Sequence, residues 1–440
     1  MKTHLWSFVL SWSRVGINAM LFLAATRFLT LSEIGLFATA FAPVRMIQGI
    51  HKAALPDAVI ILGGSRGRIE ALFAVSLVSG GALSLGFAVL GWAFNPLLLS
   101  LAPIPLVHGL AAVPDGLLRR GLRIRALALR TLAVQLVAAG VALWMLRTGQ
   151  GVAALVAFAV LNAVLGSAVT VLLARWRPKG LPALRMLRLL WPKTVQIIAR
   201  ALLNTGLFPL VQLMIGLTLG PAAAGAFQIA TRMVELIEAL MLSPMRFVSL
   251  PELRTVPDLP SAVMAQLGTI AMLSTWVWCG VWISAPDILR LAVGADHTTA
   301  AVPLLRALAP FALISALSMP VVQALNAKGY TALVLGRAFV LLGIGTLMAG
   351  IGLWLNVQAV AAAVSVSAIL VSLWFVPRAL NALSMAGSNL LILAKPLGAA
   401  GVMILTLLAL PLPFAAQVVV GTAVYGAVLL IVTHSQRQLA

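Results

Sequence analysis

The chain has 440 residues, of which 62% are hydrophobic and only 9% are charged. A soluble domain carries about 25% charged residues, so this chain could not cover its own surface in water. Its 30 Lys and Arg against 10 Asp and Glu give a net charge of +20. The basic residues lie in short segments between apolar runs, which is typical of membrane topology rather than of nucleic-acid binding. The lone Cys279 excludes an intramolecular disulfide and a multi-cysteine metal site.

The N-terminal run begins like a signal peptide, with Lys2 ahead of an apolar stretch, but Arg14 and Asn18 interrupt that stretch. We therefore expect an uncleaved first span. A spanning helix needs about 20 mostly apolar residues, and Pro, Gly and charged residues divide the chain into fourteen such runs. The predicted spans are 6–27, 34–54, 71–94, 97–118, 127–146, 152–174, 194–217, 222–249, 262–284, 299–325, 331–354, 357–380, 390–410 and 414–433.

Basic residues are distributed unevenly between the two sets of alternate loops. If the N-terminus is cytoplasmic, the loops on that side hold 20 of the 30 Lys and Arg, and the opposite loops hold only Arg27, Arg147 and Arg290. This bias follows the positive-inside rule. It predicts that both termini lie in the cytoplasm, as expected for an even number of spans in a bacterial inner-membrane protein.

An internal repeat divides the predicted spans into two sets. Arg-x3-Asn-x2-Leu-Phe occurs at 14–22 and again at 200–208, and Gly-x-Phe-x-x-Ala follows at 35–40 and 225–230. Two matches in the same order at similar spacing indicate duplicated lobes. The expected fold is an all-α polytopic membrane protein of about 14 transmembrane helices, with two pseudo-symmetric six-helix lobes plus two C-terminal helices. The predicted parts are an N-terminal lobe 1–176, a basic cytoplasmic linker 177–193, a C-terminal lobe 194–384 and two additional helices in 385–440.

Polar residues recur on one face of four predicted spans. A charge at the bilayer centre costs about 2.5–3.5 kcal/mol on insertion scales, so intramembrane charges mark candidate functional sites. Guanidinium groups match phosphate oxygens bidentately, so we expect a cationic cavity for an anionic group. The predicted substrate-binding residues are Arg14, Asn18, Arg45, Gln48, Gln196, Arg200, Asn204, Arg232, Glu235 and Glu238.

Structural roles for some of these residues stay open from the sequence. Arg14 is near enough to the interface for its side chain to reach the headgroups. Arg232, Glu235 and Glu238 are spaced three residues apart and could neutralise one another. Asp115 is expected to be a helix-end residue, and Arg130 an interfacial one.

Enzyme signatures are absent from the sequence. It contains no HExxH, no Gly-x4-Gly-Lys-Ser/Thr, no paired cysteines and no acidic cluster for a divalent metal. We expect no catalysis, no cofactor and no metal site. Without an ATPase domain, transport would be passive, ion-coupled or dependent on a separate subunit.

Several loop sequences resemble those of bacterial polysaccharide-lipid flippases. These are the segment 26–37 with its Thr-Leu-Ser-Glu-Ile-Gly, the segment 215–227 with Gly-Pro-Ala-Ala-Ala-Gly, the basic segment 117–128, and Ala-Leu-Asn-Ala-Lys-Gly at 324–329. The family belongs to the multidrug, oligosaccharidyl-lipid and polysaccharide exporter superfamily. The resemblance implies two six-helix lobes around a cavity lined by the first, second, seventh and eighth spans, and alternating access.

The resemblance also implies a polyprenyl-diphosphate-linked glycan as substrate, translocated from the inner to the outer leaflet for surface polysaccharide synthesis. Membrane lipids are further partners, and other polysaccharide-assembly proteins stay open as partners. One alternative is a cation-coupled multidrug exporter of the same superfamily, which would rely on membrane carboxylates such as Glu235 and Glu238. Another is a membrane glycan polymerase or ligase, although such proteins usually carry a large outward loop.

Overall fold

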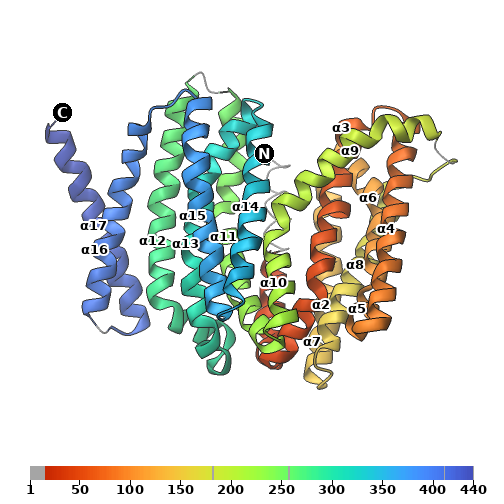
Figure 1. The fold of residues 1–440 in the computed structure, drawn as a ribbon, viewed down its shortest axis with the longest axis horizontal. Coiled ribbons are helices and arrows are strands. Elements are labelled where there is room, and N and C mark those ends of the chain that lie inside the picture. The colour runs from red at the N-terminus through yellow and green to blue at the C-terminus, as the bar shows by residue number, and fades with distance from the viewer. Residues whose placement is uncertain (1–14, 181–182, 256–257, 411, 440) are drawn as a thin grey trace. The chain divides into compact units, whose positions relative to one another are not determined.

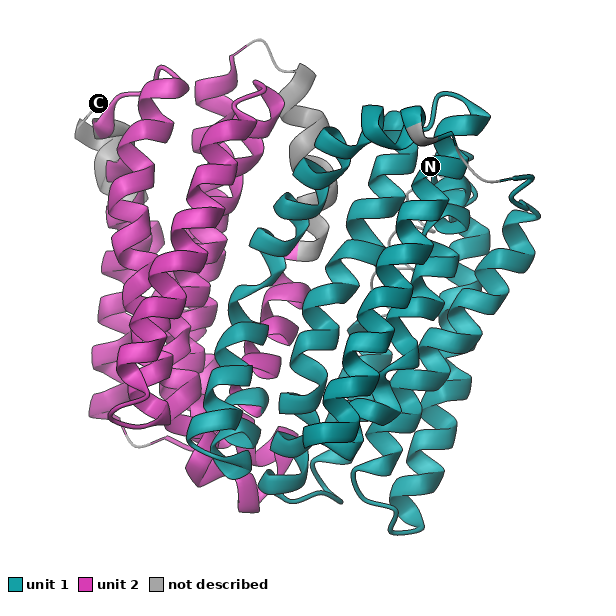
Figure 2. Cartoon of the chain, turned by 45° about the vertical axis from the view of Figure 1, so that its right-hand side comes forward, with its two compact units in different colours: residues 1–228 teal, residues 229–440 magenta. Residues whose placement is uncertain are grey.

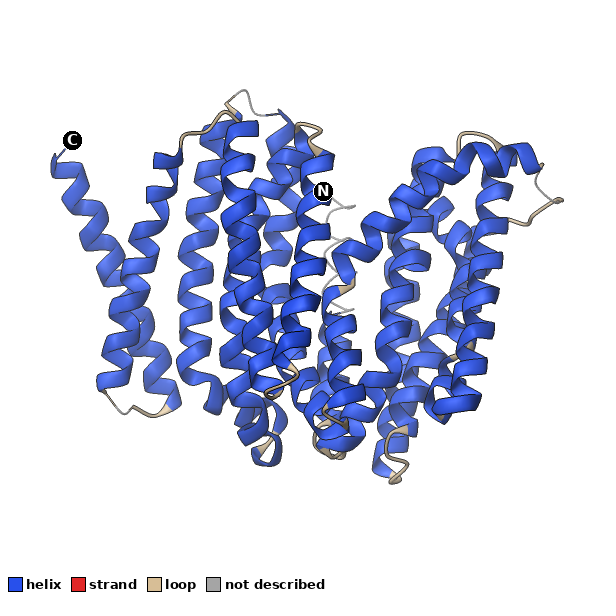
Figure 3. Ribbon diagram, in the orientation of Figure 1, coloured by secondary structure: helices blue, strands red, loops and turns tan. Residues whose placement is uncertain are grey.

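The protein is almost entirely helical. The computed structural model describes residues 15–180, 183–255, 258–410 and 412–439. Helices account for 89% of the described residues, which contain no strand (Figure 3). The all-α prediction is confirmed.

The first of two compact units comprises residues 1–228 (Figure 2). Its helices are Val15–Ala25, α2 (Leu31–Gly49), the π-helix η1 (Ile50–Ala54), α3 (Leu55–Leu62), α4 (Arg66–Phe94), α5 (Pro96–Leu101), α6 (Pro103–Arg120), α7 (Ile124–Arg147), α8 (Ala153–Ala174), α9 (Leu184–Thr205), α10 (Leu207–Thr218) and the start of α11 (Pro221–Thr255). Within this unit α4 packs on α6, α6 on α8, α7 on α8, and α2 on α10.

The second unit comprises residues 229–440 and contains the rest of α11. Its main packing pairs are α12 with α13, α13 with α15, α14 with α15, and α16 with α17 (Figure 1). The Tyr425 hydroxyl links the helix Phe414–Leu439 to the helix Leu259–Val293. It lies 2.8 Å from the Thr275 hydroxyl and donates to the Met272 carbonyl at 2.7 Å. The helices are α12 (Leu259–Val293), α13 (Ala295–Ala327), α14 (Thr331–Gly352), α15 (Val357–Ala382), the 3-10 helix η2 (Gly387–Leu393), α16 (Ala394–Ala409) and α17 (Phe414–Leu439).

Ten helices in the described ranges are long and apolar enough to cross a bilayer, or eleven if the bent pair α9–α10 forms one span. The chain is therefore a multi-pass membrane protein, and the total of fourteen spans stays a prediction. Trp92, Phe94 and Trp354 are more than four-fifths exposed. Exposed aromatic side chains at helix ends suit the headgroup level of a bilayer.

The predicted seventh span differs from its expected form. Its helix begins at Leu184, ten residues before the expected start, and the chain bends by 59° between Thr205 and Leu207. Residues 184–193 of the predicted basic linker therefore belong to the first half of α9, which packs on α2, α3 and α4. This packing, together with that of α10 on α2, places both helices in the first compact unit, whereas the lobe boundaries at 176 and 194 stay predictions.

The start of α2 is encoded locally by Thr30-Leu-Ser-Glu33. The Glu33 backbone N–H donates to the Thr30 hydroxyl at 3.3 Å, and the Thr30 N–H donates to the Glu33 carboxylate at 2.8 Å. This reciprocal arrangement is a capping box, which satisfies two backbone donors that a helix start leaves without intrahelical partners. It therefore sets the position of Gly35, one turn into the helix.

The matching glycines of the internal repeat touch each other within the first unit. A Cβ atom at Gly35 would overlap the Pro221 carbonyl oxygen and would lie 2.5 Å from the Gly225 nitrogen. A Cβ atom at Gly225 would in turn overlap the Leu31 carbonyl oxygen. The start of α2 and the start of α11 therefore cross at backbone distance, which only residues without a side chain permit.

We expect Gly35→Ala to destabilise the protein by about 1–3 kcal/mol, because overpacking a tight contact costs this much and the obstacle is backbone. Gly140→Ala in α7 is the matched control, since a Cβ there meets nothing within 4 Å. Thermal unfolding of the purified variants measures the difference. A Gly35→Ala variant as stable as Gly140→Ala would show that α2 and α11 do not depend on this close approach.

Candidate functional site

A polar stripe runs along α2 and continues into η1. Arg45, Gln48 and Lys52 are spaced three and four residues apart, so they share one helix face. Arg45 and Gln48 are half-buried and Lys52 is exposed. Polar residues on a span rarely face lipid, so this stripe is a candidate binding surface.

A second stripe lies on α9, next to the first. Gln196, Arg200 and Asn204 are exposed and spaced four residues apart. At the end of α9, a Cβ at Gly49 would lie 3.0 Å from the Thr205 hydroxyl and 3.8 Å from the Ala201 carbonyl oxygen. The two helices therefore meet beside Arg200 and Asn204, and the structure brings the predicted site residues of α2 and α9 together in the first unit.

The other predicted site residues are placed as follows. Asn18 is half-buried on the helix Val15–Ala25 of the first unit, and Arg14 lies outside the described residues. In the second unit Arg232 donates to the Glu235 carboxylate at 2.8 Å on α11, and Glu238 is half-buried on the same helix. The expected pairing within this group is thus present for Arg232 and Glu235.

A break in helical hydrogen bonding lies directly after the α2 stripe. Pro56 has no backbone N–H, so the carbonyl four residues earlier, that of Lys52, loses its α-helical partner. The π-helix η1 spans this point, with the Leu55 N–H donating to the Ile50 carbonyl. Arg119 of α6 supplies the missing donor, because its Nη2 donates to the Lys52 carbonyl at 3.0 Å.

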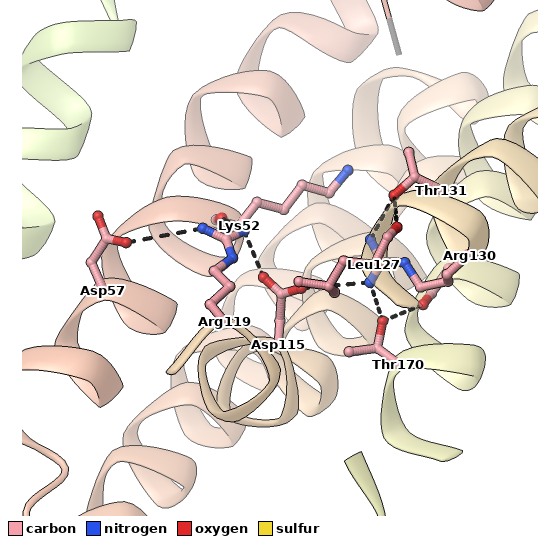
Figure 4. A network of polar contacts seen from close by, with 9 residues as sticks. Lys52, Asp57, Asp115, Arg119, Leu127, Arg130, Thr131 and Thr170 are labelled. Carbon is pink, nitrogen blue, oxygen red and sulfur yellow. Dashed lines mark hydrogen bonds and ion pairs between the residues drawn. The ribbon is translucent and has the colours of Figure 1, made fainter. Parts of the chain in front are cut away.

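Asp115 lies at the centre of the polar network around this break (Figure 4). Its carboxylate is 2.6 Å from Arg119 Nη2 and 3.5 Å from Arg130 Nη1. Arg119 also lies 3.9 Å from the Asp57 carboxylate. The Asp115 side chain is 12% exposed, so a carboxylate here requires cationic partners. The network joins α3, α6 and α7 within the first unit.

Arg130 extends the network to α8. Its Nη1 donates to the Thr170 hydroxyl and its Nη2 to the Thr131 hydroxyl at 3.3 Å. Both hydroxyls donate in turn to backbone carbonyls, that of Thr170 to Gly166 at 2.6 Å and that of Thr131 to Leu127 at 2.8 Å. Arg130 thus takes part in an internal ion pair, and its expected position near the membrane interface stays a prediction.

The electrostatic balance of this part of the first unit is positive. Arg200 lies within electrostatic range of Asp57, so α9 also belongs to the same charged region. The cations of this region are Arg45, Lys52, Arg119, Arg130 and Arg200, against the carboxylates Asp57 and Asp115. The excess of positive charge suits an anionic ligand.

Sequence reasoning missed the roles of Arg119 and Asp115, although two local signals were present. Asp115 and Arg119 are four residues apart, the spacing of a helical ion pair. Lys52 stands four residues before Pro56, the spacing that leaves a carbonyl without its donor. No signal in the sequence joined these two local patterns, because Arg119 and Lys52 are 67 residues apart.

Metal ligands do not cluster in the described part of the chain. Its His, Cys, Asp and Glu side chains form no group of three or more that could hold an ion. The predicted site residues on α2 and α9 are cations and amides, which can bind and orient an anionic group.

The fold resembles that of known membrane transporters. Lipid II flippase MurJ in an inward closed conformation matches with a TM-score of 0.79 and 14% identity, over 98% of this chain and 99% of that chain. An inward-facing multidrug resistance MATE family transporter of the MOP superfamily matches with a TM-score of 0.63 and 17% identity, over 85% and 95%. An outward-facing MATE structure matches with a TM-score of 0.55 and 16% identity, over 86% and 96%. The protein thus has the fold of this transporter superfamily.

The family follows from the sequence itself. The model of the family described as Polysaccharide biosynthesis protein matches residues 24–302, which is more than half of the chain. The chain therefore belongs to this polysaccharide biosynthesis protein family, and the resemblance found in the loop sequences is confirmed. No curated protein sequence matches the chain.

We expect Asp115→Ala to destabilise the protein by about 3 kcal/mol, because removing one partner of a buried ion pair leaves uncompensated charges, here those of Arg119 and Arg130. The control is Arg66→Ala, which removes an exposed i,i+4 pair with Glu70 at 3.3 Å and should cost less than about 1 kcal/mol. Unfolding of both variants in the same lipid is compared. Equal stabilities would mean that water or lipid headgroups compensate the arginines.

Proposed function

We propose that this protein is a flippase that carries a polyprenyl-diphosphate-linked saccharide from the inner to the outer leaflet of the bacterial cytoplasmic membrane. It would act by alternating access in the synthesis of a cell-surface polysaccharide. The observation that supports this most directly is the cationic region formed by α2 and α9 in a chain of the polysaccharide biosynthesis family. Membrane lipids would be its other partners.

A diphosphate is the part of such a substrate that a bilayer excludes most strongly. Guanidinium forks replace its hydration with paired hydrogen bonds, and Arg45 and Arg200 stand on the two adjacent stripes. The amides of Gln48, Gln196 and Asn204 both donate and accept, as sugar hydroxyls require. Asn18, Arg232, Glu235 and Glu238, together with Arg14, are proposed to line the remainder of the substrate path.

A cation-coupled multidrug exporter is the second candidate, since MATE transporters share the fold. Such a function would depend on membrane carboxylates that can bind a cation. Arg232 already pairs with Glu235 at 2.8 Å, and the cations of the first unit outnumber its carboxylates. These charges favour an anionic substrate.

We expect mass spectrometry of the protein purified in native lipid to find a co-purified polyprenyl diphosphate or its glycosylated form. Arg45→Ala and Arg200→Ala should each lower its amount at least about tenfold, because each removes a charge-assisted contact worth about 1.5–3 kcal/mol. Arg→Lys at either position should restore part of it, since lysine keeps the charge but loses the fork.

The matched control for these variants is Arg147→Ala, which removes an exposed arginine at the end of α7. Export of surface polysaccharide, measured in cells that depend on each variant, should follow the amount of bound lipid. Normal export by both Arg45→Ala and Arg200→Ala, or a co-purified cationic compound in place of the diphosphate, would contradict the proposed substrate.

The direction of transport requires the basic loops to lie in the cytoplasm. In a Cys279→Ser background, we expect Gly180→Cys, at an exposed position between α8 and α9, to resist a membrane-impermeant thiol reagent in intact cells. The same cysteine should react after the membrane is opened. Labelling in intact cells would place this loop and both termini outside and would reverse the proposed orientation.

A further inference from the structure

The break at Pro56 leaves one carbonyl that the protein must satisfy from elsewhere. In an α-helix the Lys52 carbonyl would accept the backbone N–H of residue 56, which proline lacks. Arg119 Nη2 donates to it at 3.0 Å. The guanidinium of Arg119 thus takes the place of the backbone donor that Pro56 lacks.

The arginine is itself held in place by a chain of contacts. Asp115 lies 2.6 Å from Arg119 and 3.5 Å from Arg130, and Arg130 is bonded to Thr170 of α8. Gly116 of α6 allows the backbone at Pro56 to approach closely, because a Cβ at position 116 would lie only 2.8 Å from the Pro56 carbonyl oxygen. The donor is therefore aimed at the Lys52 carbonyl by residues of α6, α7 and α8.

The π-helix η1, which contributes one π-turn between α2 and α3, determines which way the α2 stripe faces. Each residue of an α-helix turns the face by about 100°, so the extra residue of a π-turn rotates everything on one side of it relative to the other. Leu55, Ala58 and Val59 of α3 are fully buried, which prevents α3 from rotating. Val44 of α2 is fully buried too, so a regular helix would turn Arg45 and Gln48 away only together with a repacking of α2.

We propose that Arg119 is a positioning residue for substrate binding: by capping the Lys52 carbonyl it maintains the π-turn that orients Arg45, Gln48 and Lys52. This role rests on the proposed function of the α2 stripe. It requires no contact between Arg119 and the substrate. It also explains why a carboxylate, Asp115, is kept inside a cationic region, since it anchors the capping group.

The test is a double-mutant cycle with Arg119→Ala, Pro56→Ala and the double variant, in a Cys279→Ser background. Pro56→Ala returns an N–H to position 56, so the Lys52 carbonyl no longer needs the arginine. One readout is the affinity of purified protein in lipid nanodiscs for geranylgeranyl diphosphate. The other is the distance between spin labels at Ser32→Cys and Ile61→Cys, both exposed and about 40 Å apart along the helix.

We expect Arg119→Ala to weaken binding about tenfold or more, because a misoriented α2 stripe loses at least one charge-assisted hydrogen bond to the diphosphate. The same variant should shift the label distance. Pro56→Ala should also weaken binding, because a regular helix turns the stripe away. In the Pro56→Ala background, Arg119→Ala should add less than about threefold. Arg119→Lys should recover part of the affinity through its pairing with Asp115, and Arg123→Ala, an exposed arginine of the following loop, should change neither readout.

An equal loss of affinity from Arg119→Ala in both backgrounds would overturn the proposal, because the arginine would then act on the ligand directly. A shifted label distance with unchanged affinity would overturn it too, since the turn would be structural only. If the parent protein binds no diphosphate, the proposed function fails and the positioning role falls with it. The label distances still decide separately whether Arg119 maintains the turn.

Discussion

The first unit depends on one constraint of the bilayer: every backbone polar group and every charge must find its partner inside the protein. Pro56 removes one backbone donor, and three other helices, η1, α6 and α7, respond to this loss. A π-helix accommodates the proline ring, Arg119 caps the Lys52 carbonyl, and Asp115, which also pairs with Arg130, holds Arg119 in place. The local rule that a proline breaks a helix thus becomes a tertiary network.

This network also explains how a strongly basic region can exist within a membrane protein. Asp115 and Asp57 neutralise part of the charge of Arg119, and Arg130 is neutralised by Asp115 and hydrogen-bonded to two threonine hydroxyls. The cations of the α2 and α9 stripes belong to the same region as these neutralised charges. A site for an anionic group requires such an arrangement, because the empty site must be stable before the ligand arrives.

The internal repeat has a physical counterpart in the contact of Gly35 with Gly225. The repeated sequence has a glycine near the start of α2 and another near the start of α11, and two backbones can cross closely only where both residues are small. The capping box at Thr30 and Glu33 sets the start of α2 and therefore the depth of its glycine. Both glycines of this contact therefore belong to the repeated sequence.

The sequence alone determined the class of protein, because burial in lipid is governed by composition and by the length of apolar runs, both of which are local. It also determined the α2 and α9 stripes, since helical periodicity decides which side chains share a face. Only the tertiary structure decided where α9 starts and bends. It also decided that Arg119 contacts Lys52 and that Arg130 contacts Asp115 and Thr170. These contacts link residues on different helices, and periodicity along one helix carries no information about which neighbour that helix meets.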